Sequence, residues 1–104
     1  MDVNEHPVAV LRALRKLGAD IRLARRRRRI PAAVLAQRVA ISRMTLHQVE
    51  KGAAGVLTGT YAGVLFALGM LDRLADVADP RHDVTALHLD EENLPQRIRL
   101  PKRS

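Results

Sequence analysis

Residues 30–52 read IPAAVLAQRVAISRMTLHQVEKG, and this stretch decides the fold. Pro31 suits the first position of a helix, which the spacing of apolar residues predicts over residues 32–39. The inward positions of this helix are Val34, Leu35 and Val39. Residues 40–42 are left as a tight turn, so a second helix follows at once and the two helices form one unit.

The second helix of this unit takes Ser42 as its N-cap, because a serine hydroxyl accepts a hydrogen bond from a free amide of the first turn. The helix continues to residue 50 or 51, and Gly52 supplies the left-handed residue that ends it. Its core-facing positions are Leu46 and Val49. The positions that point away from these two, and are free to contact a ligand, are Arg43, Met44, Thr45, His47 and Gln48.

A longer helix is predicted before the unit, over residues 8–28. Its apolar residues recur every three or four positions at Leu11, Leu14, Leu17, Ile21 and Ala24. Gly18 lies in the middle, where glycine costs about 1 kcal/mol relative to alanine. We therefore expect a break at Gly18, or a new start of the helix near Leu17.

Two shorter helices are predicted after the unit. Residues 60–68 form the first, which Gly69 stops, and residues 71–78 form the second. The inward positions of the first are Tyr61, Val64, Leu65 and Leu68. Further on, residues 96–100 alternate apolar and polar side chains as a β-strand does.

The composition indicates one small helical domain. At 104 residues the chain has room for a single core. Its only aromatic residues are Tyr61 and Phe66, so the core must be aliphatic, which favours packed helices over strands rich in aromatic residues. We expect an all-α domain of five helices over residues 1–79. Residues 80–104 would form a C-terminal extension that contains the strand and contacts a partner or a second copy.

Positive charge is concentrated in the first half of the chain. Residues 1–52 contain twelve Lys/Arg and four Asp/Glu, whereas residues 53–104 contain six and seven, within a net charge of +7. Five consecutive arginines, residues 25–29, stand directly before the two-helix unit. A genomic base composition that favours arginine codons would explain why the chain uses arginine in place of lysine. It would not explain why these residues are concentrated in the first half. The pattern indicates a surface that faces a polyanion such as nucleic acid.

Other chemistries lack the residues that they require. The chain has no cysteine, which excludes disulfides and thiolate metal sites. The four histidines lack ligand spacing, so we expect no metal: His6, His47, His82 and His88. Without a glycine-rich phosphate loop, or a base beside Ser42, we expect no enzyme and no cofactor. The polar N-terminus and the short apolar run at 62–71 favour a cytoplasmic protein outside the membrane.

The spacing of several residues resembles the Xre/Cro/repressor-type helix-turn-helix family. The match covers residues 17–68 and rests on Leu17, Ile21, Arg25, Leu35, Ala36, Ile41, Ser42, Leu46, Val49, Glu50, Lys51, Gly52, Leu68 and Gly69. The resemblance implies a lambda-repressor-like domain with its helix-turn-helix motif at residues 32–51. Two positions depart from the family pattern: Ala40 replaces a turn glycine, which implies a strained left-handed residue or an altered turn. Ala32 replaces a glutamine that often contacts phosphate.

The resemblance also implies roles for individual side chains. The second helix of the motif would lie in the DNA major groove and contact bases through Arg43, Met44, His47 and Gln48. The expected phosphate contacts from this helix are Ser42, Thr45 and Lys51. Apart from the resemblance, Arg26, Arg27, Arg28 and Arg29 are candidates for phosphate contact or for plain solvation. Arg25 and Glu50 would form an internal ion pair that joins the first and third helices. The alternative for the outer face is an ordinary solvated helix surface.

A narrower resemblance concerns the C-terminal half. Residues 59–83, followed by LPQRIRLP at 94–101, look like HipB-like antitoxins and regulators encoded beside HipA-like kinases. This implies a homodimer that represses its own operon, or, as the alternative function, an antitoxin that binds and neutralises a HipA-like kinase. An apolar stripe at Leu71, Leu74 and Ala78 suits a dimer seam, or else packs against the first helix. RNA binding is disfavoured by the scarcity of aromatic residues.

Overall fold

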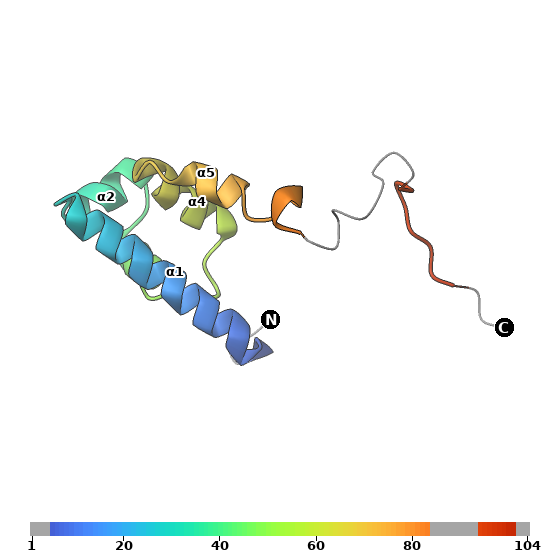
Figure 1. Ribbon diagram of the computed structural model, residues 1–104. Coiled ribbons are helices and arrows are strands. Elements are labelled where there is room, and N and C mark those ends of the chain that lie inside the picture. Colours follow the sequence, from blue (N-terminus) through green and yellow to red (C-terminus); the bar gives the residue numbers. More distant parts are fainter. Residues whose placement is uncertain (1–4, 84–93, 102–104) are drawn as a thin grey trace. The chain divides into compact units, whose positions relative to one another are not determined.

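The computed structural model describes residues 5–83 and 94–101 (Figure 1). The chain divides into two units, residues 1–74 and residues 75–104. The first unit contains the two-helix unit and almost all of the helical structure. His88, one of the residues considered above, lies outside the described residues.

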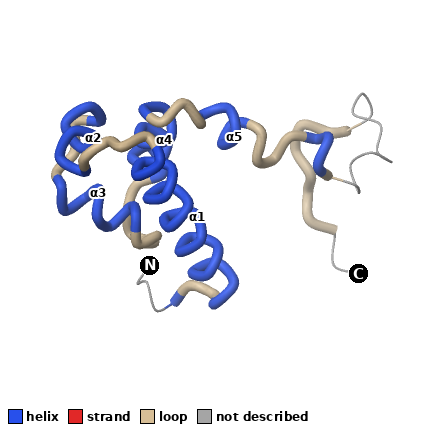
Figure 2. Tube along the Cα trace, turned by 60° about the vertical axis from the view of Figure 1, so that its left-hand side comes forward, coloured by secondary structure: helices blue, strands red, loops and turns tan. Residues whose placement is uncertain are grey.

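The described residues form five α-helices and no strand, which confirms the all-α prediction. The elements are α1 (Val8–Arg27), α2 (Ala32–Val39), α3 (Arg43–Glu50), α4 (Thr58–Ala67), α5 (Leu71–Ala75) and the 3₁₀ turn η2 (Pro80–His82). Within the first unit α1 packs against α3, and α2 packs against both α3 and α4 (Figure 2). Helix α3 is thus held from two sides.

The core of the first unit is aliphatic apart from one tyrosine. Its buried side chains come from α1 to α4 and the residue after α4: Ile21, Ala24, Leu35, Ala36, Leu46, Val49, Tyr61, Val64, Leu65 and Leu68. The inward positions predicted for α3 and α4 are all among them. Partly buried residues surround this cluster, and Leu74 of α5 is one of them. Leu71 is 36% exposed, so only part of the predicted α5 stripe packs on the core.

Helix α1 is continuous, so the predicted break at Gly18 is wrong. A Cβ atom built on Gly18 would lie 2.5 Å from the backbone nitrogen of Gly52 and 2.6 Å from the carbonyl oxygen of Val49. Gly52 has a φ of +72°, and a Cβ there would collide with the Leu14 carbonyl. Gly18 is therefore present because the end of α3 approaches the α1 backbone, which no local pattern reveals.

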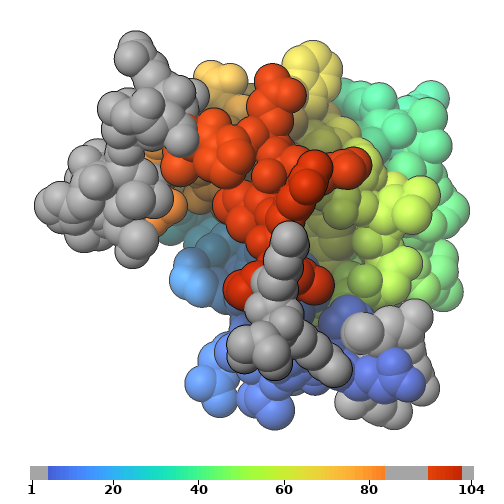
Figure 3. Space-filling view, turned by 90° about the vertical axis from the view of Figure 1, so that its right-hand side faces the viewer, coloured from blue at the N-terminus to red at the C-terminus, as the bar shows by residue number. Residues whose placement is uncertain are grey.

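The first turns of α1 extend beyond the core. Val8 is 64% exposed and Val10 is 41% exposed, and this part of the helix lies at the surface in Figure 3, in blue. The buried residues of α1 are Gly18, Ile21 and Ala24, all in its second half. The half of α1 that ends in Arg25, Arg26 and Arg27 is therefore the half fixed to the rest of the unit.

Helices α4 and α5 have the predicted order but different ends. Helix α4 begins at Thr58, two residues before the predicted start, and Gly69 stops it with a φ of +76°. Helix α5 ends at Ala75 and not at Ala78 as predicted. It buries no residue completely, so packing gives little support for further turns. In the second unit, Asp79 instead caps η2 by accepting a hydrogen bond from the Arg81 amide.

The predicted strand at residues 96–100 is wrong. Residues 94–101 contain no strand, and all of them are exposed, with Ile98 at 83% and Leu100 at 92%. A strand is stabilised by backbone hydrogen bonds to a neighbour. None of the described residues supplies such bonds to this segment. The alternation of side chains is present, but the pairing that would turn it into a strand is not.

Candidate functional site

The connection between α2 and α3 is a tight turn closed by backbone hydrogen bonds. Ala40 has a φ of +61°, the left-handed conformation expected if alanine takes the place of the family's glycine. The Ile41 amide donates to the Ala36 carbonyl at 3.0 Å. The Ser42 hydroxyl accepts from the Thr45 amide at 3.0 Å and donates to the Thr45 hydroxyl at 2.9 Å. This confirms Ser42 as the N-cap and fixes the first turn of α3.

Helix α3 has a buried side and an exposed side. Leu46 is 1% exposed and Val49 is completely buried. Four outer side chains predicted to contact a ligand are all exposed: Arg43, Met44, His47 and Gln48. Within the described residues none of these side chains makes a hydrogen bond or an ion pair. The structure therefore confirms their exposure, while their contact with DNA stays a prediction.

The ion pair predicted between Arg25 and Glu50 is present. The Arg25 Nε atom donates to Glu50 Oε2 at 2.7 Å, and Nη2 donates to Oε1 at 3.0 Å. A third donor, Nη1, reaches the Ile30 carbonyl at 3.0 Å. The two side chains are only 13% and 8% exposed. The hydrogen bonds that Arg25 donates to Glu50 raise the pKa of Arg25, although desolvation by burial acts in the opposite direction.

This two-point contact joins the end of α1 to the end of α3. Two parallel bonds between a guanidinium and a carboxylate fix orientation as well as distance. Together with the approach of Gly18 to Gly52, it gives α3 a rigid attachment along its inner side. The outer side chains of α3 are therefore presented from a fixed support.

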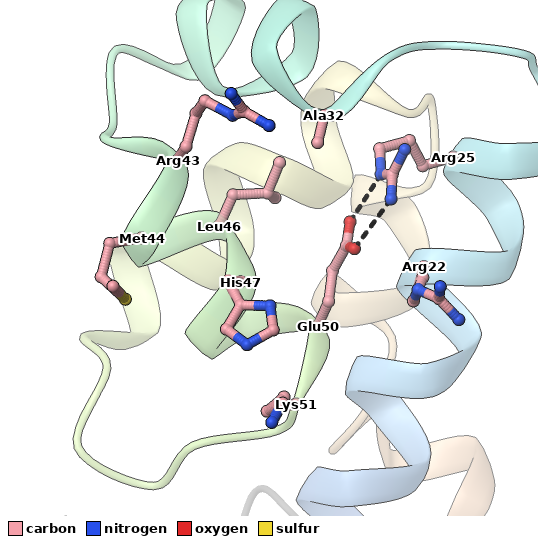
Figure 4. Close-up of a pocket in the computed structure, with 9 residues that line it drawn as sticks. All are labelled: Arg22, Arg25, Ala32, Arg43, Met44, Leu46, His47, Glu50 and Lys51. Carbon is pink, nitrogen blue, oxygen red and sulfur yellow. Dashed lines mark hydrogen bonds and ion pairs between the residues drawn. The ribbon is translucent and has the colours of Figure 1, made fainter.

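A hollow of about 780 Å³ lies between α1 and α3 (Figure 4). Its polar lining residues are Arg22, Arg25, Arg43, His47, Glu50 and Lys51. The one carboxylate in this set is paired with Arg25, so the remaining charge is positive. Ala32, where the family often has glutamine, adds only a methyl group to the lining. The arrangement suits an anion.

Arg22 is the member of this lining that the sequence reasoning missed. Its guanidinium makes no hydrogen bond or ion pair within the described residues, and its side chain is exposed. Arg22 precedes Arg25 by three residues, a spacing that puts two side chains on one face of a helix. That spacing was the available signal, because Arg25 was already expected to face α3.

The five consecutive arginines are divided by the structure. Arg25 is paired with Glu50 of α3, and it also lines a second hollow of about 660 Å³ at the end of α1, together with Arg26, Arg27 and Arg29. Arg28 donates through Nη1 to the Ala24 carbonyl at 2.9 Å, and the Arg28 amide donates to the same carbonyl at 3.2 Å. Phosphate contact by residues 26–29 stays a prediction. Such a contact would lie beside the hollow between α1 and α3 and not inside it, because residues 26–29 do not line that hollow.

Comparisons with family models, with curated proteins and with solved structures find no match to this chain. Within residues 5–83 and 94–101, no group of three His, Asp or Glu side chains is placed to hold a metal ion. No helix in the described part of the chain combines the length and the apolar character needed to cross a membrane.

Proposed function

We propose that this chain is a sequence-specific DNA-binding regulator of the helix-turn-helix class, with α3 as its recognition helix. One observation carries the proposal: α3 is fixed on its inner side by Leu46, Val49 and the Glu50 ion pair, while Arg43, Met44, His47 and Gln48 on its outer side have no polar partner in the part of the chain that the structure describes. A helix presented in this way suits insertion into the major groove, which is wide enough to admit a helix.

The outer side chains of α3 match the chemistry of base edges. Arg43 can donate two parallel hydrogen bonds to guanine O6 and N7, and Gln48 can pair with adenine N6 and N7. His47 adds a further polar group, and Met44, which is 66% exposed, suits a thymine methyl group. A set of four such residues on one exposed face supports base reading over plain solvation.

The flanking residues match the chemistry of the DNA backbone. Lys51 follows the last residue of α3 and is exposed. The hydroxyls of Ser42 and Thr45 lie at the beginning of the same helix. The arginines at positions 26–29 add charge beside the unit. Such contacts supply affinity and register without sequence information.

The proposed regulator acts as a homodimer on a palindromic operator. Each subunit places α3 in one half-site, and the half-sites lie about 34 Å apart on one face of the duplex. The surface around Phe66 on α4 supports a protein contact, because this apolar side chain is 70% exposed and residues 52–71 of the sequence contain no charged side chain. The same surface would also serve the alternative function, in which a HipB-like antitoxin binds a HipA-like kinase.

Selection from a random duplex library, followed by binding measurements on variants, tests the proposal. Arg43→Ala and Gln48→Ala should each cost about 1–3 kcal/mol on the selected duplex and little on a mixed-sequence duplex. Arg27→Ala should weaken binding to both duplexes alike. Equal losses on the two duplexes for Arg43→Ala and Gln48→Ala would remove their reading role. Failure to enrich any sequence would contradict sequence-specific binding.

The two functions are separated by their partners. For the antitoxin, a kinase encoded beside this chain should co-purify with it, and Phe66→Asp should break that complex without changing binding to the selected duplex. For the regulator alone, no such complex forms, and Phe66→Asp acts only through dimerisation. It then lowers affinity for a palindromic site more than for a single half-site.

A further inference from the structure

The hollow between α1 and α3 contains unpaired positive charge. Arg22 lies on its α1 side, and Lys51 lies at the C-terminal end of α3 (Figure 4). Neither side chain has a hydrogen bond or an ion pair within the described residues. Arg43 adds a third cation from the beginning of α3. Like charges brought together without counter-charges repel one another, so an anion in the hollow would relieve this repulsion.

The only carboxylate in the hollow does not fill that role. Both oxygens of Glu50 accept hydrogen bonds from Arg25, and the Glu50 side chain is 8% exposed. Its charge is compensated inside the protein, so it offers little to Arg22 or Lys51. The hollow differs from an ordinary solvated surface because Arg22 and Lys51 have no partner within the described residues, while the charge of Glu50 is already neutralised by Arg25.

We propose that this hollow receives a phosphate group of the DNA backbone, held between Arg22 on α1 and Lys51 at the end of α3. The inference rests on the proposed function, since it places the duplex against α3. It assigns Arg22, which lies outside the run of five arginines, as a phosphate contact. In this arrangement one strand runs across the mouth of the hollow, while the outer residues of α3 face the bases.

Salt-dependent binding of the full chain to a mixed-sequence 30-base-pair duplex tests the assignment, because phosphate contacts do not depend on sequence. The variants are Arg22→Gln and Lys51→Gln, with Arg12→Gln as the matched control. Arg12 is an exposed arginine on the same helix, ten residues earlier and so about 15 Å away along the axis. Each lost phosphate contact lowers the slope of log K against log salt by about 0.9.

We expect Arg22→Gln to reduce the slope by up to about 0.9 and to weaken binding several-fold at moderate salt. Arg12→Gln should produce less than half of that change, and Arg22→Lys, which keeps the charge, should retain the slope. Because Arg22 and Lys51 share one phosphate, the double variant should lose less affinity than the product of the two single losses. The melting temperatures of these surface variants should match that of the parent chain.

If Arg22→Gln changes the salt slope no more than Arg12→Gln does, the assignment of Arg22 is overturned. The proposed function survives that result as long as the parent chain still binds its selected duplex. No salt-dependent binding of the parent chain to any duplex would overturn both. A site for a free anion predicts another result, namely that inorganic phosphate raises the melting temperature of the parent chain more than that of Arg22→Gln at equal ionic strength. Such a difference, with unchanged DNA slopes, would assign the hollow to free phosphate and end the DNA assignment.

Discussion

The two sides of α3 differ in every respect that matters for binding. On the inner side, Leu46 and Val49 are buried and Glu50 is held by a two-point ion pair. On the outer side, Arg43 and Gln48 are exposed and have no partner among the described residues. An eight-residue helix is too short to be stable alone in water. The packing of the inner side therefore keeps α3 folded, and this fixes the positions from which the outer side chains project.

This difference separates residues that determine stability from residues proposed to determine binding. Substitutions on the inner side should lower the free energy of unfolding, and substitutions on the outer side should leave it nearly unchanged. The predictions below probe that separation, beginning with the largest expected effect.

Removing one partner of the inner ion pair should be the most damaging change. Arg25→Met leaves the Glu50 carboxylate nearly buried without its partner, which costs about 3–5 kcal/mol. The double variant Arg25→Met, Glu50→Leu should be less destabilised than Arg25→Met alone, since no charge is left unpaired. Urea unfolding measures both. The exposed pair Lys16–Asp20, with side chains 78% and 54% exposed, is the control, and Lys16→Met should cost at most about 1 kcal/mol.

The same substitution at two helical glycines should have opposite signs. Gly18→Ala places a methyl group 2.5 Å from the Gly52 backbone nitrogen and should destabilise the chain by about 1–3 kcal/mol. Gly59→Ala meets no atom within 4 Å and should stabilise α4 by about 0.5–1 kcal/mol. Thermal unfolding of the two variants measures the sign of each change in stability relative to the parent chain. A stabilising Gly18→Ala would mean that α1 and the end of α3 are not in close contact.

Tyr61 should make stability fall at alkaline pH. Its hydroxyl donates to the Ala53 carbonyl at 2.8 Å, and burial raises the pKa of Tyr61 above its usual value of 10.0. Above about pH 10 the unfolded chain ionises this tyrosine while the folded chain resists, so stability is lost as pH rises. Tyr61→Phe should cost about 1 kcal/mol at neutral pH and flatten this decline. Because Tyr61 is the only tyrosine, its phenolate absorbance reports the titration directly.

The smallest effects on stability are expected at the exposed positions of α3. Met44→Ala and Gln48→Ala should change the free energy of unfolding by no more than about 0.5 kcal/mol. Ser42→Ala, which removes the N-cap at the same helix, should cost about 1 kcal/mol and is the matched comparison. Chemical denaturation of the three variants provides the ranking. A larger loss at Gln48 than at Ser42 would erase the distinction between the two sides.

The parts of the fold that local chemistry determines could be predicted from the sequence. The ends of α2 and α3 agree with the prediction because Pro31, Ser42 and Gly52 act on their own neighbours. The burial of α3 and α4 followed from the spacing of apolar residues. The Arg25–Glu50 pair came from the family resemblance, since its partners are 25 residues apart and no spacing rule links them.

The errors arose where a contact distant in sequence decides the outcome. Gly18 was read as a helix breaker because its neighbour Gly52 is invisible to a local pattern. Helix α5 was predicted too long because its lack of a buried residue could not be foreseen. Residues 96–100 alternate correctly but find no pairing partner among the described residues. The role of Arg22 in the hollow could not be predicted from the sequence, because it depends on how close α1 lies to the end of α3.

The most direct test of the central claim is the change in backbone amide chemical shifts as the chain is titrated with its selected duplex. The account predicts that the largest shifts fall on residues 42–51 and on Arg22. Shifts around the exposed Phe66 on α4 should be smaller, and they should be the same when a mixed-sequence duplex is used. The account would be contradicted if residues 43–48 stayed unshifted while residues elsewhere in the chain responded to the duplex.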